Sequence, residues 1–136
     1  MTLAAREADI VNVNFDLREG RVSRRTARSG FADVTVEKLA WIKEAAGERF
    51  DHLELGAWVF MANVTEGRED VAAALATGFG ADARDVLEVP HFLIGTVNEL
   101  VDDLRRRREL YGFSFVVVPG DAAEAFAPVV QRLTGT

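Results

Sequence analysis

The sequence predicts an α/β domain in which parallel strands alternate with amphipathic helices. Apolar, β-branched segments recur along the chain, and stretches whose apolar residues repeat at helical spacing lie between them. Strands and helices that alternate in this way form a parallel sheet with helices packed against it. The chain has 136 residues, the length of one domain, and its 49% of hydrophobic residues is enough for a core.

The N-terminal part predicts a helix, a strand and a long loop. Residues 2–8 favour a short helix, and residues 10–15 are apolar and β-branched, as in a strand. Residues 16–33 are polar and rich in Arg and Ser, so we expect a long loop there. Loops of this length in compact domains are usually functional or mobile.

A second helix and a second strand follow. Thr35 is placed to cap the helix, and Gly47 is placed to end it. Residues 53–63 are apolar on both faces beyond Glu54, which is typical of a strand covered on both sides. The residues that we expect on the inward face of the helix are Val36, Leu39, Ile42 and Ala46.

The next segment predicts a helix over residues 66–77, capped by Thr65 and ended by Gly78. Residues 82–89 favour one or two helical turns before Pro90. Residues 91–95 are apolar, and they fit either a very short strand or a buried loop. With the strands over residues 10–15 and 53–63, and a third over residues 113–118, the sequence predicts three clear strands and leaves a fourth, over residues 91–95, open.

The C-terminal part carries the sharpest local signals. Thr96 and Glu99 fit a capping box. In this motif the Thr96 side chain accepts a hydrogen bond from the Glu99 amide, and the Glu99 side chain accepts one from the Thr96 amide. The helix that they start is predicted to end at Gly112, and residues 113–118 follow as a strand. The basic run at residues 105–108 fits a solvated face near the end of this helix.

Composition excludes several classes of protein. With 16 Lys and Arg against 22 Asp and Glu, the net charge of −6 argues against a nucleic-acid partner bound through bulk charge. The absence of cysteine excludes disulfides, thiol nucleophiles and cysteine-bound metals, and it suits a cytoplasmic location. No metal site is expected from His52 and His91, and the longest apolar run, residues 55–62, is too short for a membrane span of ~20 residues.

Five segments carry a resemblance to a known family. They are residues 3–11 (LAAREADIV), 37–42 (EKLAWI), 92–96 (FLIGT), 111–114 (YGFS) and 118–121 (VPGD). They resemble the C-terminal part of luciferase-like monooxygenases, most closely the deazaflavin-dependent oxidoreductases. On this resemblance, residues 1–136 form a single domain that matches strands six to eight and helices five to eight of a TIM barrel. The implied fold is a partial barrel-like arc of three to four parallel strands with flanking helices, with residues 92–95 as a loop.

The resemblance also implies a cofactor and a missing part. The implied cofactor is FMN or the deazaflavin coenzyme F-420. The alternative that the chain alone binds no cofactor stays open. Family members hold the cofactor phosphate on a glycine-rich loop before the first helix, and this sequence begins at Met1, so we expect that loop and strands one to five to be absent. Three or four strands cannot close a barrel, which takes about eight. We therefore expect a homo-oligomer or a complementing chain, with Trp58, Val59 or Phe60 pointing into the missing side.

Candidate site residues follow from the active-site position at the C-terminal ends of barrel strands. Asn14 and Asn63 are candidates for hydrogen bonds to a flavin-like ring, although Asn also caps turns. Arg24 and Arg25, in the basic segment over residues 18–28, are candidates for a phosphate or an oligoglutamate tail, or simply belong to a solvated loop. His91 is a candidate acid or base, or a structural histidine.

Three functional hypotheses remain open from the sequence. The first is a luciferase-like flavin- or deazaflavin-dependent oxidoreductase domain, active once other strands complete it. The second is a truncated remnant that folds and associates without catalysis. The third is a module that binds a small anionic ligand through its basic loop.

Overall fold

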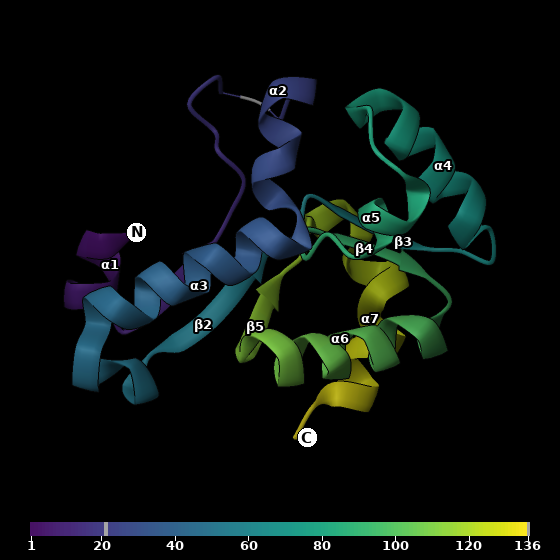
Figure 1. Ribbon diagram of the computed structural model, residues 1–136. Helices are drawn as coiled ribbons and strands as arrows, with labels where there is room; N and C mark the ends of the chain where they lie inside the picture. The colour runs from purple at the N-terminus through teal and green to yellow at the C-terminus, as the bar shows by residue number, and fades with distance from the viewer. Residues whose placement is uncertain (21, 136) are drawn as a thin grey trace.

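The computed structural model describes residues 1–20 and 22–135 and has a mixed α/β fold (Figure 1). The strands form two parallel sheets, one with the order β1-β2-β5 and the other pairing β3 with β4. The predicted parallel α/β class is therefore confirmed. The two small sheets do not confirm the arc of a barrel that the resemblance implies. The strands are β1 (Ile10–Val13), β2 (Glu54–Trp58), β3 (Met61–Val64), β4 (Phe92–Gly95) and β5 (Phe113–Val117).

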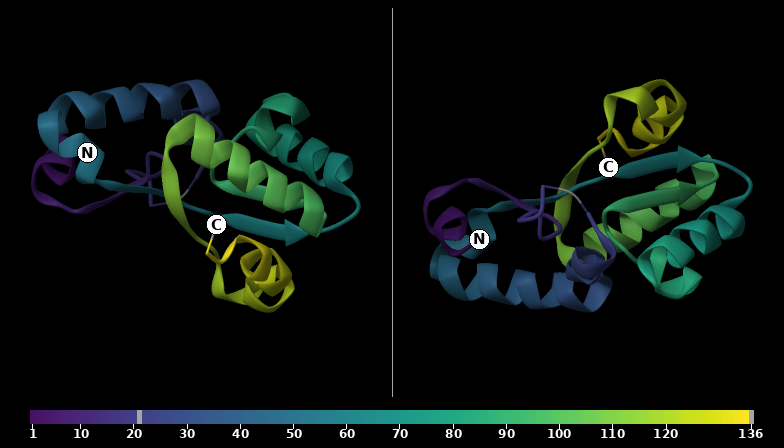
Figure 2. Two further views of the ribbon diagram at one scale, coloured as in Figure 1. Left: turned by 90° about the horizontal axis from the view of Figure 1, so that it is seen from below. Right: turned by 90° about the horizontal axis from the view of Figure 1, so that it is seen from above.

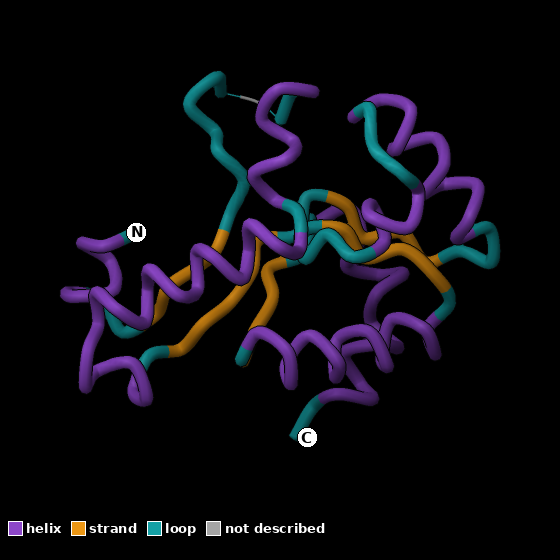
Figure 3. Tube along the Cα trace, viewed as in Figure 1, coloured by secondary structure: helices purple, strands orange, loops and turns teal. Residues whose placement is uncertain are grey.

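The two sheets share one long segment of chain. Only Val59 and Phe60 separate β2 from β3, so the strand predicted over residues 53–63 is present but interrupted (Figure 3). At this interruption the Val59 amide donates to Val117 in β5, and the Phe60 amide donates to His91 just before β4, both at 2.8 Å. Residues 92–95 thus form a strand, and the loop implied by the family resemblance is wrong for them.

Helices lie on both sides of the strands. Figure 2 shows α3, α4 and α6 on one side and α7 on the other. Short 3-10 turns at Arg28–Gly30, Gly47–His52 and Gly120–Ala122 connect some of the elements. The helices are α1 (Thr2–Glu7), α2 (Arg24–Ala27), α3 (Ala32–Ala46), α4 (Arg68–Phe79), α5 (Ala83–Leu87), α6 (Val97–Tyr111) and α7 (Ala123–Leu133). Within the described residues, no helix combines the length and the apolar character needed to cross a membrane.

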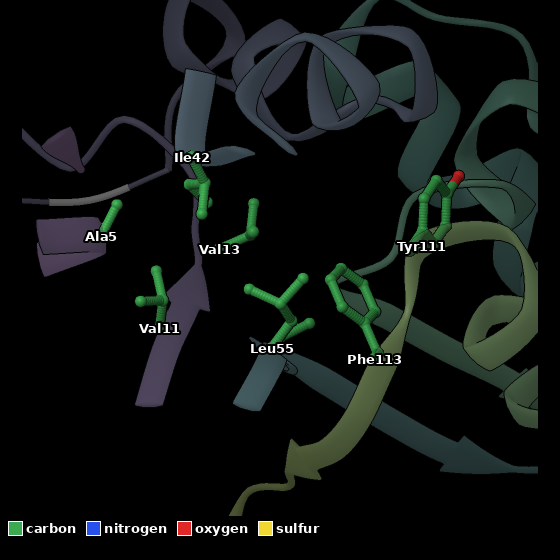
Figure 4. Packing of buried hydrophobic residues seen from close by; sticks show 8 residues of the cluster. Ala5, Val11, Val13, Ile42, Leu55, Tyr111 and Phe113 are labelled. Atoms are coloured by element: carbon green, nitrogen blue, oxygen red, sulfur yellow. The ribbon is translucent and has the colours of Figure 1, made fainter. Parts of the chain in front are cut away.

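Buried apolar residues gather where helices meet strands. One cluster fills the space between α1, α3 and the three-stranded sheet (Figure 4); its buried members are Ala5, Val11, Val13, Ile42, Leu55, Ala57, Tyr111 and Phe113. A second cluster joins α4 and α5 to β4 and to Phe15, and a third joins α6 and α7 to β4 and to Val59. Each cluster places an amphipathic helix against a strand, as the alternating pattern predicts.

The sequence predicted one long loop over residues 16–33, but the structure places two helical segments there. Ser23 and Thr26 form a capping box that starts α2, and α3 already begins at Ala32. Thr35 is therefore not the cap of α3: it lies in the first turn, fully buried, and its hydroxyl has no hydrogen-bond partner. The buried stripe of α3 accordingly consists of Thr35, Lys38 and Ile42, while Val36 is half exposed.

Other helix ends show how far local signals extend. The capping box of Thr96 and Glu99 is confirmed, and α6 ends at Gly112, whose φ of 72° suits glycine. In contrast, α4 begins after Gly67, where the Gly67 amide donates to Thr65 Oγ1 at 3.0 Å. It ends at Gly80 in the left-handed conformation, two residues beyond the predicted Gly78.

Candidate functional site

The three-stranded sheet has one covered face and one uncovered face. Side chains alternate between the faces of a strand, and Val11 and Val13 of β1 point into the core with Leu55 of β2. Their neighbours on the other face are open to solvent: Ile10 is 54% exposed and Trp58 is 50% exposed. We call this second side the uncovered face; it consists of Ile10, Asn12, Gly56, Trp58, Phe115 and Val117, with Phe60 at its edge.

A β-bulge puts Phe115 on the uncovered face. Leu55 pairs with Phe113, but Gly56 pairs with Phe115, so Ser114 is the extra residue that shifts the alternation. A Cβ at Gly56 would lie 2.7 Å from the ring of Phe115 and 2.8 Å from Oδ1 of Asn12. Glycine at this position therefore lets an aromatic ring and a carboxamide meet over the middle strand.

The expectation for residues 58–60 is met in part. Trp58 and Phe60 are exposed on the open side, but Val59 is completely buried in the cluster between α6, α7 and β4. Val59 continues the alternation of β2, in which Leu55 and Ala57 also point inward and Trp58 points outward. Exposed large aromatic side chains next to one another are the kind of surface that binds a ligand or a partner.

Lys38 of α3 binds the backbone directly after β1. Its Nζ donates to the carbonyl of Asn14 at 2.6 Å and to the carbonyl of Ser29. Burial lowers the pKa of Lys38, because the charged form loses its hydration. The Arg18 guanidinium, hydrogen-bonded to Asp16, lowers the pKa of that carboxyl to about 2. This buried lysine was missed from the sequence, and the available signal was its place on the same helical stripe as Ile42.

His91 lies immediately behind the uncovered face. Its Nδ1 is 2.9 Å from the carbonyl oxygen of Trp58, and since that oxygen only accepts, Nδ1 carries the proton. Nε2 is buried without a hydrogen-bond partner, and the ring lies 4.5 Å from the ring of Phe15 and 6.3 Å from that of Phe60. Burial lowers the pKa of His91 to about 4, so the imidazole is neutral near pH 7.

The arginines of the basic segment are engaged by other groups. Arg24 donates to the carbonyl of Thr77 at 3.2 Å near the end of α4, and Arg25 pairs with Glu19 at 2.9 Å. Two further pairs, Arg18 with Asp16 and Arg28 with Asp33, neutralise the same segment. Arg21 lies outside the described residues. A phosphate would therefore have to compete with the carbonyl that binds Arg24 and with the carboxylates that pair with Arg18, Arg25 and Arg28.

The cleft beside Arg24 has the wrong charge for an anion. It encloses about 890 Å³ between α2, α4 and α5, and Arg28 also lines it. Four acidic side chains face these two arginines: Asp33, Asp82, Asp85 and Glu88. The excess of carboxylates disfavours an anionic ligand here.

The structure does not gather the five candidate residues into one pocket. Phe15, which follows Asn14 in the chain, contacts the His91 ring. Asn63 lies in β3, where it pairs with Ile94 of β4. Arg24 and Arg25 turn to separate partners, and the cleft beside Arg24 includes none of the other candidates.

Arg107 is an interior residue that the sequence placed among solvated ones. It is almost completely buried, and it donates to the carbonyls of Pro90 and Phe92, each at 2.9 Å. It also pairs with the buried Asp103 one helical turn earlier, at 2.7 Å. Burial lowers the pKa of Arg107. Arg107 thereby fastens α6 to the start of β4, and it is an exception within a run that the sequence predicted to lie mostly on the solvent face.

Comparison with known proteins adds no relative: no protein-family model, no curated protein and no solved structure matches this chain. The fold and the site define an α/β protein with parallel sheets, one of which exposes an apolar, aromatic face.

Proposed function

We propose that this chain is part of a luciferase-like oxidoreductase that uses a flavin or a deazaflavin, and that another polypeptide completes its cofactor site. The observation that carries the proposal is the uncovered face. Parallel sheets almost always have both faces covered, so exposed residues such as Ile10 and Trp58 leave this sheet incomplete. An arc of a barrel has the same property, because its inner face is filled only when the barrel closes.

The side chains on the uncovered face suit the flat ring of such a cofactor. FMN and deazaflavins supply hydride transfer when they are bound, and the protein contributes orientation and polar contacts. Trp58 and Phe60 offer exposed aromatic surface for stacking. Asn12, whose Oδ1 lies over Gly56, offers a carboxamide for a polar ring edge. This combination of aromatic and amide groups supports a site for a planar heterocycle.

The phosphate of the cofactor calls for groups beyond this face. The described arginines of residues 18–28 have carboxylate or carbonyl partners of their own. We therefore assign the phosphate contacts to groups of the completed site other than these arginines. The isolated chain is expected to bind the ring weakly, and the assembled site is expected to bind it more tightly.

The two tryptophans provide a matched test of this proposal. Trp41 and Trp58 are both 50% exposed, but Trp41 lies on α3 and only Trp58 lies on the uncovered face. In a Trp41→Phe variant the remaining emission comes from Trp58, and in a Trp58→Phe variant it comes from Trp41. Titration with FMN, and separately with the deazaflavin coenzyme, is expected to quench Trp58 more strongly and in a saturable way. Equal quenching of both tryptophans, or none, would refute the proposal.

A further inference from the structure

A second cleft lies along the free edge of β5. It encloses about 550 Å³ between β5, α6 and α7. Four consecutive strand residues line it: Phe113, Ser114, Phe115 and Val116. Successive side chains of a strand point to opposite faces, so a cleft that touches all four lies at the edge of the strand. Since β2 occupies one edge of β5, this cleft marks the other edge.

The walls of the cleft combine apolar and basic side chains. Helix α7 contributes Phe126, Val130 and Leu133. Helix α6 contributes the three arginines Arg105, Arg107 and Arg108 against the single acid Glu109. Arg107 is buried and already bonded to Asp103 and two backbone carbonyls, so Arg105, whose side chain is 53% exposed, is the cation that an occupant can reach. An occupant that fits these walls carries apolar side chains and at least one carboxylate.

The edge itself calls for an extended occupant. A strand edge presents backbone N–H and C=O groups that another extended segment can pair with. Strand addition of this kind gains affinity from main-chain hydrogen bonds and selectivity from alternate side chains. The cleft therefore suits a strand better than a compact ligand, because four consecutive residues of β5 line it.

We propose that the strand added at β5 is β1 of a second copy of this chain. In the described part of the chain, β1 pairs with β2 on one edge only. It runs parallel to β5 through β2, so its addition preserves the direction of every strand in the sheet. Glu7 and Asp9 precede it. The Asp9 side chain is 96% exposed and pairs with Arg49 at 3.4 Å, and we expect it to exchange this partner for Arg105 of α6 when the strand adds.

The uncovered face gains from this contact. Ile10 of the added strand lies on the same side of the sheet as Phe115 and Val117, so exposed apolar residues of two copies become neighbours. The contact is head to tail, because each copy uses its β5 edge and offers its β1 edge. Head-to-tail contacts form a closed ring or an open filament. The inference deepens the proposed function by making the second polypeptide another copy, which contributes Asn12 to the cofactor site.

Charge exchange across the contact tests the inference. Light scattering of the natural chain is expected to give a mass above the 14.9 kDa of one copy. Asp9→Lys and Arg105→Glu are each expected to weaken association about tenfold, a change of about 1.4 kcal/mol. The double variant is expected to restore it, because the exchanged charges meet again between copies. Glu44→Lys, a substitution of an exposed acid on α3, should leave the mass unchanged.

A peptide identifies the edge directly. A synthetic peptide of residues 8–16, ADIVNVNFD, is expected to shift the amide NMR signals of residues 113–117, whereas a scrambled peptide is not. A mass of one copy at all concentrations, a double variant that does not recover, or peptide shifts away from β5 would each overturn the inference. The tryptophan titration stays independent: association without FMN binding removes only the proposed function, and FMN binding by a monomer removes only this inference.

Discussion

The two faces of the β1-β2-β5 sheet differ as much as two faces of one sheet can. On one face, Val11, Val13 and Leu55 are buried against α1 and α3 (Figure 4). On the other, Ile10 and Trp58 belong to the same strands and are half exposed. Both sets are apolar, so burial here is decided by which face a helix covers and not by residue type. The covered face stabilises the chain, and the uncovered face is free for contact with something else.

Two isoleucines allow the largest test of this difference. Ile42→Ala removes a fully buried side chain of α3 and should lower the free energy of unfolding by about 2–5 kcal/mol, since the core cannot close the space completely. Ile10→Ala makes the same chemical change on the uncovered face and should cost about 0.5 kcal/mol. Urea denaturation of both variants at low protein concentration measures the two values.

A loss at Ile10 that matches the loss at Ile42 would show that the second face is covered in solution. Repeating the measurement over a range of protein concentrations separates the explanations. A cost that rises with concentration points to burial between copies, because only association depends on concentration.

The packing of α6 against the start of β4 depends on a buried cation. Arg107→Met leaves Asp103 with one remaining partner, Arg106 at 2.9 Å, and frees the carbonyls of Pro90 and Phe92. Removal of one member of a buried ion pair usually costs 3–5 kcal/mol, and the remaining arginine places this case near about 3 kcal/mol. Arg105→Met, a half-exposed neighbour on α6, is the matched control and should change stability by less than about 0.5 kcal/mol in the monomer.

Structural features were predicted correctly from the sequence where the interacting residues lie close together along the chain. The capping box of Thr96 and Glu99 and the stop at Gly112 were predicted correctly, because all of their partners lie within one helical turn. These signals depend on neighbours that the sequence displays directly.

Buried cations were missed for the opposite reason. Lys38 bonds the carbonyl of Asn14, and Arg107 bonds the carbonyl of Pro90, which are 24 and 17 residues away along the chain. Neither carbonyl is marked by its residue type, so only the tertiary fold reveals these partners. The same limit applies to the candidate site: Arg24 and Arg25 share a basic run, yet their partners at Thr77 and Glu19 separate them.

The last expected effect is spread over a range of pH and concerns His91, which lies between the core and the uncovered face. Burial lowers its pKa to about 4 from an ordinary value of 6.5, so between these values the unfolded chain binds a proton that the folded chain does not. Stability therefore falls as pH drops from about 6.5 to about 4, by about 3 kcal/mol in total, and this contribution is constant outside that window. His91→Asn keeps a donor for the Trp58 carbonyl but cannot titrate, so its stability should be flatter over the same range.

Two acidic groups help to isolate the histidine. Arg18 and Arg28 hold the pKa values of Asp16 and Asp33 at about 2, below their ordinary 3.8, so their stabilisation is lost only below about pH 4. Urea unfolding between pH 7 and pH 4 thus reports mainly on His91 when the natural chain is compared with the variant. Equal pH dependence in both proteins would mean that water reaches the imidazole past Phe60. In that case Phe60, at the edge of the uncovered face, does not shield His91 from water. The solvent on the uncovered side would then reach further into the protein than the burial of His91 indicates.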